Sequence, residues 1–223
     1  MIAKNTLKKL YKRGFSMSDI AKKLHVSINT VSYWMDKAHL ERRSIRDAAY
    51  KKHNPHGDPF QMNLRLGHYD QFLIGLGLGL FWGEGMKNSK SGVRLGNTDP
   101  FLILYFREFL ERICRVKREK IKYSLQLFGD VDKKEAVNFW CDVLGIKAHE
   151  LGKISEVKLR GRGTYKKKNI LGVLQIACHN TKLKGIIDTL LRTLKMSSYA
   201  VVAQLVEHVH GETPKHLAQM IEN

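Results

Sequence analysis

The sequence is short of acidic residues, and this shortage restricts the partners that the protein can have. Aspartate and glutamate number 21, against 39 lysines and arginines in 223 residues, which gives a formal net charge of +18. A surplus of this size indicates a polyanionic partner. Hydrophobic residues make up 43% of the chain. The chain can therefore form a packed core and is not a disordered basic tail.

Cysteine and long apolar runs are also scarce. Cys114, Cys141 and Cys178 form no Cys-x-x-Cys pair, so neither a zinc ribbon nor a disulfide scaffold is expected. The longest apolar stretch, Phe72 to Gly83, is about half of what spanning a membrane needs. The first residues lack the apolar run of a signal peptide. We therefore expect a cytoplasmic protein with no membrane contact.

Polar and breaker residues divide the chain into segments. Pro55, Gly57 and Pro59 lie between Ser44 and Leu66, and this predicts a linker over 46–66. The spacing of apolar residues predicts three short helices before it, in a module over 1–45. After it, in a domain over 67–196, helices are expected over 69–84, 100–114, 133–144 and 182–194, and strands over 92–97, 120–128, 157–159 and 171–178. The expected fold class is therefore α+β, with a small all-α module preceding a mixed αβ domain.

The run SMSDIAKKLHVSINTVSYWMDKAHL resembles the helix-turn-helix of resolvase-type DNA-binding domains. Ala21 is small where two helices must cross, and Ser27 is placed to cap the second of them. The turn holds His25 where glycine is usual, and histidine tolerates a positive φ.

The resemblance implies that the second of these helices binds DNA. Side chains able to meet base edges are Asn29, Thr30, Ser32 and Tyr33, while phosphate contacts are expected from Lys22, Lys23, Lys37, Arg42 and Arg43. The alternative is a three-helix bundle that binds another protein or dimerises.

A glycine-rich helix is predicted over the sequence FLIGLGLGLFWGEGMK. Gly75, Gly79 and Gly83 share one helical face, at a cost of roughly 1 kcal/mol each in helix propensity. Close packing of a second helix would compensate for this cost. Glu84 ends the face, and if the second helix belongs to another copy of the chain, the two carboxylates together suit a divalent cation.

The segment GLFWGEG resembles a divergent LAGLIDADG motif of homing endonucleases, and the similarity extends over about residues 69–195. One copy of the motif implies a homodimer joined through Gly75, Gly79 and Gly83. The resemblance also implies that Glu84 binds Mg²⁺ at a site that cuts double-stranded DNA, with Lys182 as the active-site lysine. Three features depart from the family pattern: Trp82 replaces the middle acid of the motif, the helix over 133–144 looks like an insertion, and the first strand after the motif is short.

Two basic clusters flank the expected sheet, and both would lie along DNA in the family's fold. The first runs from Arg115 to Lys122, and the second includes Lys158, Arg160 and Arg162. Phosphate contacts from these clusters would supply affinity, and strand side chains such as Arg94, Tyr123 and Gln126 would read bases. A solvated face is the alternative for either cluster taken alone.

Residues 197–223 form a tail of different character. Its segment VVAQLVEHVHG resembles the conceptual translation of a tRNA gene body. Two interpretations stay open, namely read-through without selected function and a short terminal amphipathic helix.

The leading functional hypothesis is a nucleoid-associated, homodimeric LAGLIDADG-type endonuclease that hydrolyses DNA phosphodiesters with Mg²⁺. The alternative is a non-catalytic transcriptional regulator that uses a degenerate form of the same fold. A third functional hypothesis is a recombination or transposition accessory protein that only places partners on DNA. The sequence does not define the target site.

Overall fold

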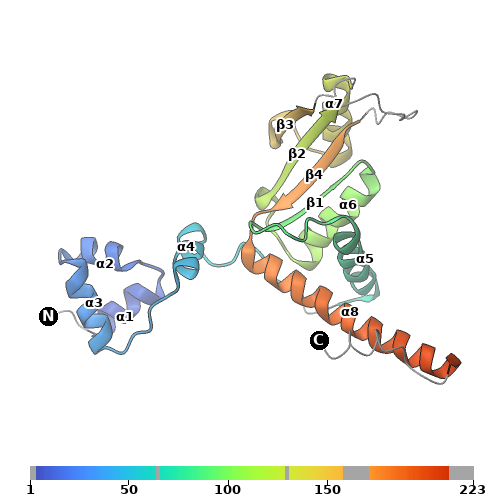
Figure 1. The fold of residues 1–223 in the computed structure, drawn as a ribbon. Helices are drawn as coiled ribbons and strands as arrows, with labels where there is room; N and C mark the ends of the chain where they lie inside the picture. Colours follow the sequence, from blue (N-terminus) through green and yellow to red (C-terminus); the bar gives the residue numbers. More distant parts are fainter. Residues whose placement is uncertain (1–3, 64–65, 129–130, 158–170, 211–223) are drawn as a thin grey trace. The chain divides into compact units, whose positions relative to one another are not determined.

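The computed structural model describes residues 4–63, 66–128, 131–157 and 171–210, with side chains described as far as Met196 in the last helix. The chain divides into two compact units, residues 1–59 and 60–223 (Figure 1). Each has a hydrophobic core of its own. The first unit is helical and the second combines helices with a mixed sheet. The predicted α+β class is therefore confirmed.

In the first unit, the helices α1 (Lys4–Lys12), α2 (Met17–Leu24) and α3 (Ile28–Lys37) surround a small apolar core. Ser16 caps α2 in a capping box with Asp19, and Ser27 caps α3 by accepting the Thr30 amide. His25 ends α2 with φ 52° and ψ 44°, the left-handed conformation expected from the sequence. α2 and α3 are thus joined by a turn of three residues.

The segment predicted as a linker contains a further helix, α4 (Ile45–His53). Ser44 caps it and also donates a hydrogen bond to Asp47 at 2.7 Å. None of its residues is buried. The sequence therefore carried no apolar spacing that could have predicted α4, because such spacing arises only where a helix buries a face.

The second unit is built on a four-stranded sheet in the order β1-β4-β2-β3. Its strands are β1 (Val93–Asn97), β2 (Ile121–Phe128), β3 (Leu151–Val157) and β4 (Val173–Cys178). β4 lies antiparallel to β1 and β2, while β3 is parallel to β2. The strand expected over 157–159 meets β3 at Val157, and residues 158–159 lie outside the described part of the chain. β3 is an edge strand with few buried residues, so its sequence has no clear alternation.

Helices cover one face of this sheet. They are α5 (His68–Glu84), α6 (Pro100–Glu108), α7 (Lys133–Leu144) and α8 (Thr181–His210), with a π-helical turn over Phe109–Ile113 and 3₁₀ turns over Arg118–Lys120 and Ala148–Glu150. In the core Phe106 stacks against Phe81 at 6.2 Å between ring centroids, and Trp140 is fully buried. The helix expected over 100–114 thus changes to π-helical geometry after Glu108.

The last helix is longer than the sequence predicted. α8 continues to His210 rather than ending near Leu194, so the first part of the predicted tail is helical, and residues 211–223 lie outside the described part of the chain. None of the described helices combines the length and apolar character needed to cross a membrane. All three cysteines are free, and burial raises the pKa of Cys178 to about 11.

Candidate nucleic-acid interface

The face of the sheet opposite the helices carries polar side chains. β2 alternates strictly between buried and more accessible residues, which places Lys122, Ser124 and Gln126 away from the core. The strand register sets Lys122 and Arg94 on either side of Ala177, and Ser124 opposite Gln175. Polar side chains from β1, β2 and β4 therefore share one surface of the sheet.

These side chains line a cavity of about 550 Å³, which we call the sheet groove. Its polar lining comes from all four strands, the 3₁₀ turn before β3 and the residue after β4. It comprises Arg94, Lys122, Ser124, Gln126, Glu150, Lys153, Ser155, Gln175 and His179. Glu150 is the one carboxylate among these lining residues. The sheet groove is thus positively charged and rich in hydrogen-bonding groups.

His179 lies at the end of the sheet groove beside two cations. Burial lowers its pKa, and the nearby charges of Arg94 and Lys122 lower it further. The imidazole is therefore held in its neutral form near neutral pH. It keeps one nitrogen as an acceptor and one as a donor.

Tyr123 is an exception among the predicted base-reading residues. Its side chain is 7% exposed and lies in the core on the helical face of the sheet, and burial raises its pKa. This burial does not favour the predicted base contact of Tyr123, because alternation along β2 turns odd-numbered residues towards the helices. Arg94, Lys122 and Gln126 do line the sheet groove together.

The predicted glycine face of α5 is open in the single chain. Gly75, Gly79 and Gly83 are exposed, and a Cβ added to any of them would meet no atom within 4 Å. A different glycine of α5, Gly77, packs against the rest of the chain, since its Cα lies against the ring of Phe109. No described element of the same chain therefore supplies the second helix that the sequence predicted.

Glu84 is exposed and is the last residue of α5. After it, Gly85 forms a bridge with Leu95, and the Met86 amide donates to the Arg94 carbonyl at 2.8 Å. The chain thus passes directly from the helix end to the edge of β1. Among the described residues, no three carboxylate, histidine or cysteine side chains gather into a metal-binding cluster.

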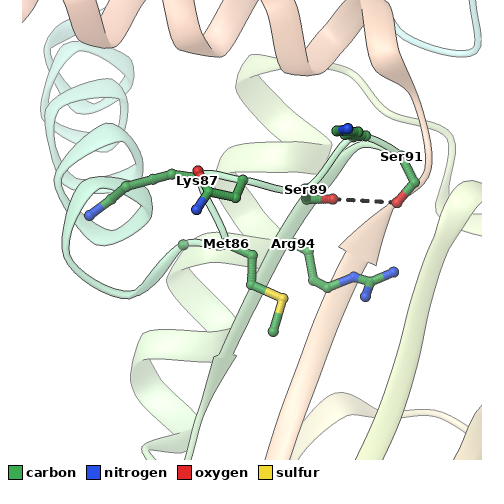
Figure 2. A pocket seen from close by; sticks show the side chains of 8 residues that line it. Met86, Lys87, Ser89, Ser91 and Arg94 are labelled. Atoms are coloured by element: carbon green, nitrogen blue, oxygen red, sulfur yellow. Dashed lines mark hydrogen bonds between the residues drawn. The ribbon is translucent and has the colours of Figure 1, made fainter.

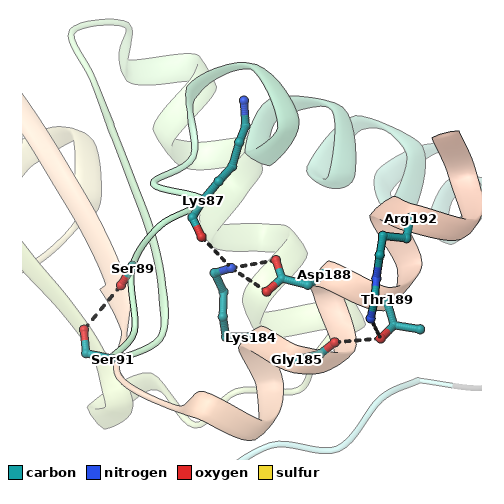
Figure 3. A network of polar contacts seen from close by, with 8 residues as sticks. All are labelled: Lys87, Ser89, Ser91, Lys184, Gly185, Asp188, Thr189 and Arg192. Carbon is teal, nitrogen blue, oxygen red and sulfur yellow. Dashed lines mark hydrogen bonds and ion pairs between the residues drawn. The ribbon is translucent and has the colours of Figure 1, made fainter. Parts of the chain in front are cut away.

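Lys182 and Lys184 occupy different environments in the first turn of α8. Lys182 is exposed, whereas Lys184 is only 7% exposed. The ammonium of Lys184 donates to the Lys87 carbonyl at 3.0 Å and to both Asp188 oxygens at 2.6 and 2.5 Å (Figure 3). The lysine that ties α8 to the segment following Glu84 is therefore Lys184, which the sequence did not single out.

In the first unit, the residues predicted to read bases differ in accessibility. Asn29 and Tyr33 are exposed on α3, as is Lys37. Thr30 contacts the capping hydroxyl of Ser27 at 2.9 Å, and Ser32 accepts a hydrogen bond from Arg42 at 2.8 Å. Both hydroxyls therefore already have partners within the unit.

Arg43 was predicted to contact phosphate, but its guanidinium is already engaged within the unit. Its guanidinium lies over the Tyr11 ring at 3.8 Å and donates to the carbonyls of Tyr11, Gly14 and Phe15. These carbonyls lie in the last turn of α1 and just after it, where a cation is favoured by the helix dipole. Arg42 is also engaged, in an exposed ion pair with Asp36 at 2.8 Å.

Three predicted DNA-binding residues, Lys158, Arg160 and Arg162, lie outside the described residues. Conversely, the sheet groove includes Lys153, Ser155, Gln175 and His179, which the sequence did not single out. For Gln175 a signal was present, since it alternates with the apolar residues Leu174 and Ile176 of a predicted strand. For Lys153 and Ser155 there was none, because β3 was placed too late in the chain.

Comparison of the chain with protein-family models, with curated proteins and with solved structures found no match.

Proposed function

We propose that this protein binds double-stranded DNA through the sheet groove of its second unit and through helix α3 of its first. The observation that carries the proposal is the composition of the sheet groove. Arg94, Lys122 and Lys153 supply positive charge, and Gln126 and Gln175 supply neutral amides, with a single carboxylate among the lining residues.

This combination matches the two components of DNA recognition. Cations neutralise phosphates and release counterions, which provides affinity without sequence preference. Gln side chains can form paired hydrogen bonds with adenine, and Arg or Lys with guanine, on the major-groove edge. Sheet and ribbon structures reach the major groove in several DNA-binding proteins. A small-molecule site, by contrast, is usually enclosed and mostly apolar.

Helix α3 supports the proposal independently. Asn29 and Tyr33 are exposed on it, and Lys37 extends the positive surface near its end. The two capped helices and their three-residue turn agree with the expected helix-turn-helix arrangement. Because the units are separate bodies, each surface can be tested by its own variants.

Binding should be measured by fluorescence anisotropy with a labelled duplex over a range of salt concentrations. Lys122→Ala should weaken binding about five- to tenfold at ~0.1 M salt and lower the slope of log K against log salt by about one, because one phosphate contact is lost. Lys133→Ala, on α7 outside the sheet groove, is the matched control and should change little. Equal effects of the two variants, or no binding by the wild type, would contradict the proposal.

A second candidate function, Mg²⁺-dependent cleavage by a homodimer, is favoured by the exposed glycine face that ends at Glu84. Gly75, Gly79 and Gly83 leave backbone accessible to a second helix, and a partner's α5 packed there would bring a second Glu84 close to the first. Exposed aromatic side chains border this face, with Phe72 and Trp82 being 56% and 40% exposed. A homodimer would cover them.

The surroundings of Glu84 meet some of the requirements of a Mg²⁺ site. The carboxylate is exposed at the carboxyl end of α5, where the helix dipole favours a cation. Mg²⁺ is usually held by one or two carboxylates together with water and substrate phosphates. When bound, it would neutralise charge on a phosphodiester and lower the pKa of a bound water. The role of this chain would be to present the Glu84 carboxylate and to hold the DNA across the sheet groove.

Cleavage is tested by incubating supercoiled DNA that carries the gene's flanking sequence with the protein and Mg²⁺. The wild type should cut, whereas Glu84→Gln should reduce cutting by at least about a hundredfold and leave binding nearly unchanged, because the amide keeps the shape but loses the charge. Specific binding without cutting by either protein would instead identify a non-catalytic regulator.

A further inference from the structure

The segment between α5 and β1 forms a second polar cavity beside the sheet groove. This cavity has a volume of about 690 Å³, and we call it the loop pocket. Its lining residues are consecutive apart from the last, and comprise Gly85, Met86, Lys87, Asn88, Ser89, Lys90, Ser91 and Arg94. None of them carries a negative charge. Arg94 also lines the sheet groove, so the two cavities meet at this side chain.

The loop pocket is formed by a segment that is anchored at several points. The Lys87 carbonyl is held by the buried Lys184 ammonium, and the Ser89 amide donates to the Met86 carbonyl at 3.1 Å. At the far end, Gly92 has a φ of 148° and packs against the backbone of Cys178 and Asn180 so closely that a Cβ would not fit. The pocket is therefore preformed, which lowers the entropic cost of filling it.

Several residues of the loop pocket carry hydrogen-bond donors. Figure 2 shows the hydroxyls of Ser89 and Ser91 turned towards each other, 3.3 Å apart, with Met86 and Arg94 side by side below them. The Nε of Arg94 is buried and has no hydrogen-bond partner among the described residues. A buried donor without a partner carries a free-energy cost that a suitable acceptor would remove.

We propose that the loop pocket binds a backbone phosphate of the nucleic acid that occupies the sheet groove. Hydroxyls, a guanidinium and two nearby ammonium groups are the donors that phosphate oxygens accept from in proteins. The absence of negative charge from the lining removes the repulsion that an anion would otherwise meet. A polymeric anion is favoured over a small one because Arg94 connects the pocket to Lys122 and His179 in the adjoining groove.

This inference rests on the proposed DNA binding, and its experiment has one readout with DNA and one without. The double variant Lys87→Ala/Lys90→Ala keeps the loop backbone and removes two exposed cations. We expect its affinity for duplex DNA to fall about tenfold at ~0.1 M salt and its salt slope to fall by at least one relative to Lys133→Ala. An unchanged affinity and slope, in a protein whose Lys122→Ala variant does bind more weakly, would overturn the loop-pocket assignment alone.

The second readout is the NMR signal of the Arg94 Nε–H group, assigned by its loss in Arg94→Lys. Inorganic pyrophosphate should shift this signal in the wild type, and the shift should require several-fold more pyrophosphate in the double variant. If pyrophosphate shifts the signal but the protein does not bind DNA, the loop pocket is still an anion site and the proposed DNA binding is wrong. No shift with either pyrophosphate or DNA would overturn the loop pocket.

Discussion

Gly77→Ala is expected to lower the free energy of unfolding by about 3 kcal/mol or more, because a methyl group at this position would fall within the ring of Phe109. Phe109 is fully buried and lies tilted against Phe106 at 5.8 Å between centroids, so a shift of its ring would disturb the core. Urea denaturation followed by circular dichroism would measure the loss.

Gly79 provides the matched control, because it lies two residues further along the same helix with no atom near its missing side chain. Gly79→Ala should leave the fold of the subunit intact and favour the helix by about 1 kcal/mol. Gly79→Leu should also fold, but it should convert a dimer into a monomer in analytical ultracentrifugation if α5 is the dimer contact. A large loss of stability in Gly79→Ala, or a dimer that persists in Gly79→Leu, would contradict this division of roles between the two glycines.

The second large effect is expected at Asp188, which neutralises the buried ammonium of Lys184. Asp188→Ala should destabilise the second unit by about 3 kcal/mol, because it leaves a cation that is only 7% exposed without its carboxylate. Asp188 itself is 41% exposed at its side chain, so its loss alone opens no cavity in the core. The effect is therefore electrostatic.

The double variant Lys184→Met/Asp188→Ala separates the charge effect from packing. Methionine keeps most of the apolar length of the lysine and contacts the Phe81 ring, above which the ammonium lies at 5.5 Å. The double variant should therefore recover most of the lost stability in thermal unfolding, as is usual when both members of a buried pair are replaced. A double variant that is less stable than Asp188→Ala would show that the hydrogen bond from Lys184 to the Lys87 carbonyl stabilises the unit more than the ion pair does.

The helix starts and most strands could be predicted because they depend on local chemistry. Ser16, Ser27 and Asp132 each accept a backbone amide at a helix start, and a polar residue followed by apolar spacing marks these positions in the sequence. β2 is recognisable because alternate residues are buried. Each of these signals involves residues within a few positions of one another.

Features that depend on distant contacts could not be predicted. Arg43 reaches carbonyls about thirty positions earlier, and nothing in its neighbourhood distinguishes it from a phosphate-binding arginine. Lys184 and Lys182 are both lysines of one helical turn, and only the fold decides which is buried. α4 buries no residue, and β3 is paired along one side by a distant strand, so neither has a local pattern.

If both units bind DNA as proposed, the separation of the chain into two units, each with its own core, determines how strongly the whole molecule would hold a duplex. The units are covalently joined near residue 60, so attachment of one confines the other to a small volume around the same DNA. Effective concentrations under such tethering reach the millimolar range, and overall avidity can exceed either separate affinity by about 10²–10⁴. Two individually weak surfaces would then suffice for long residence on one site.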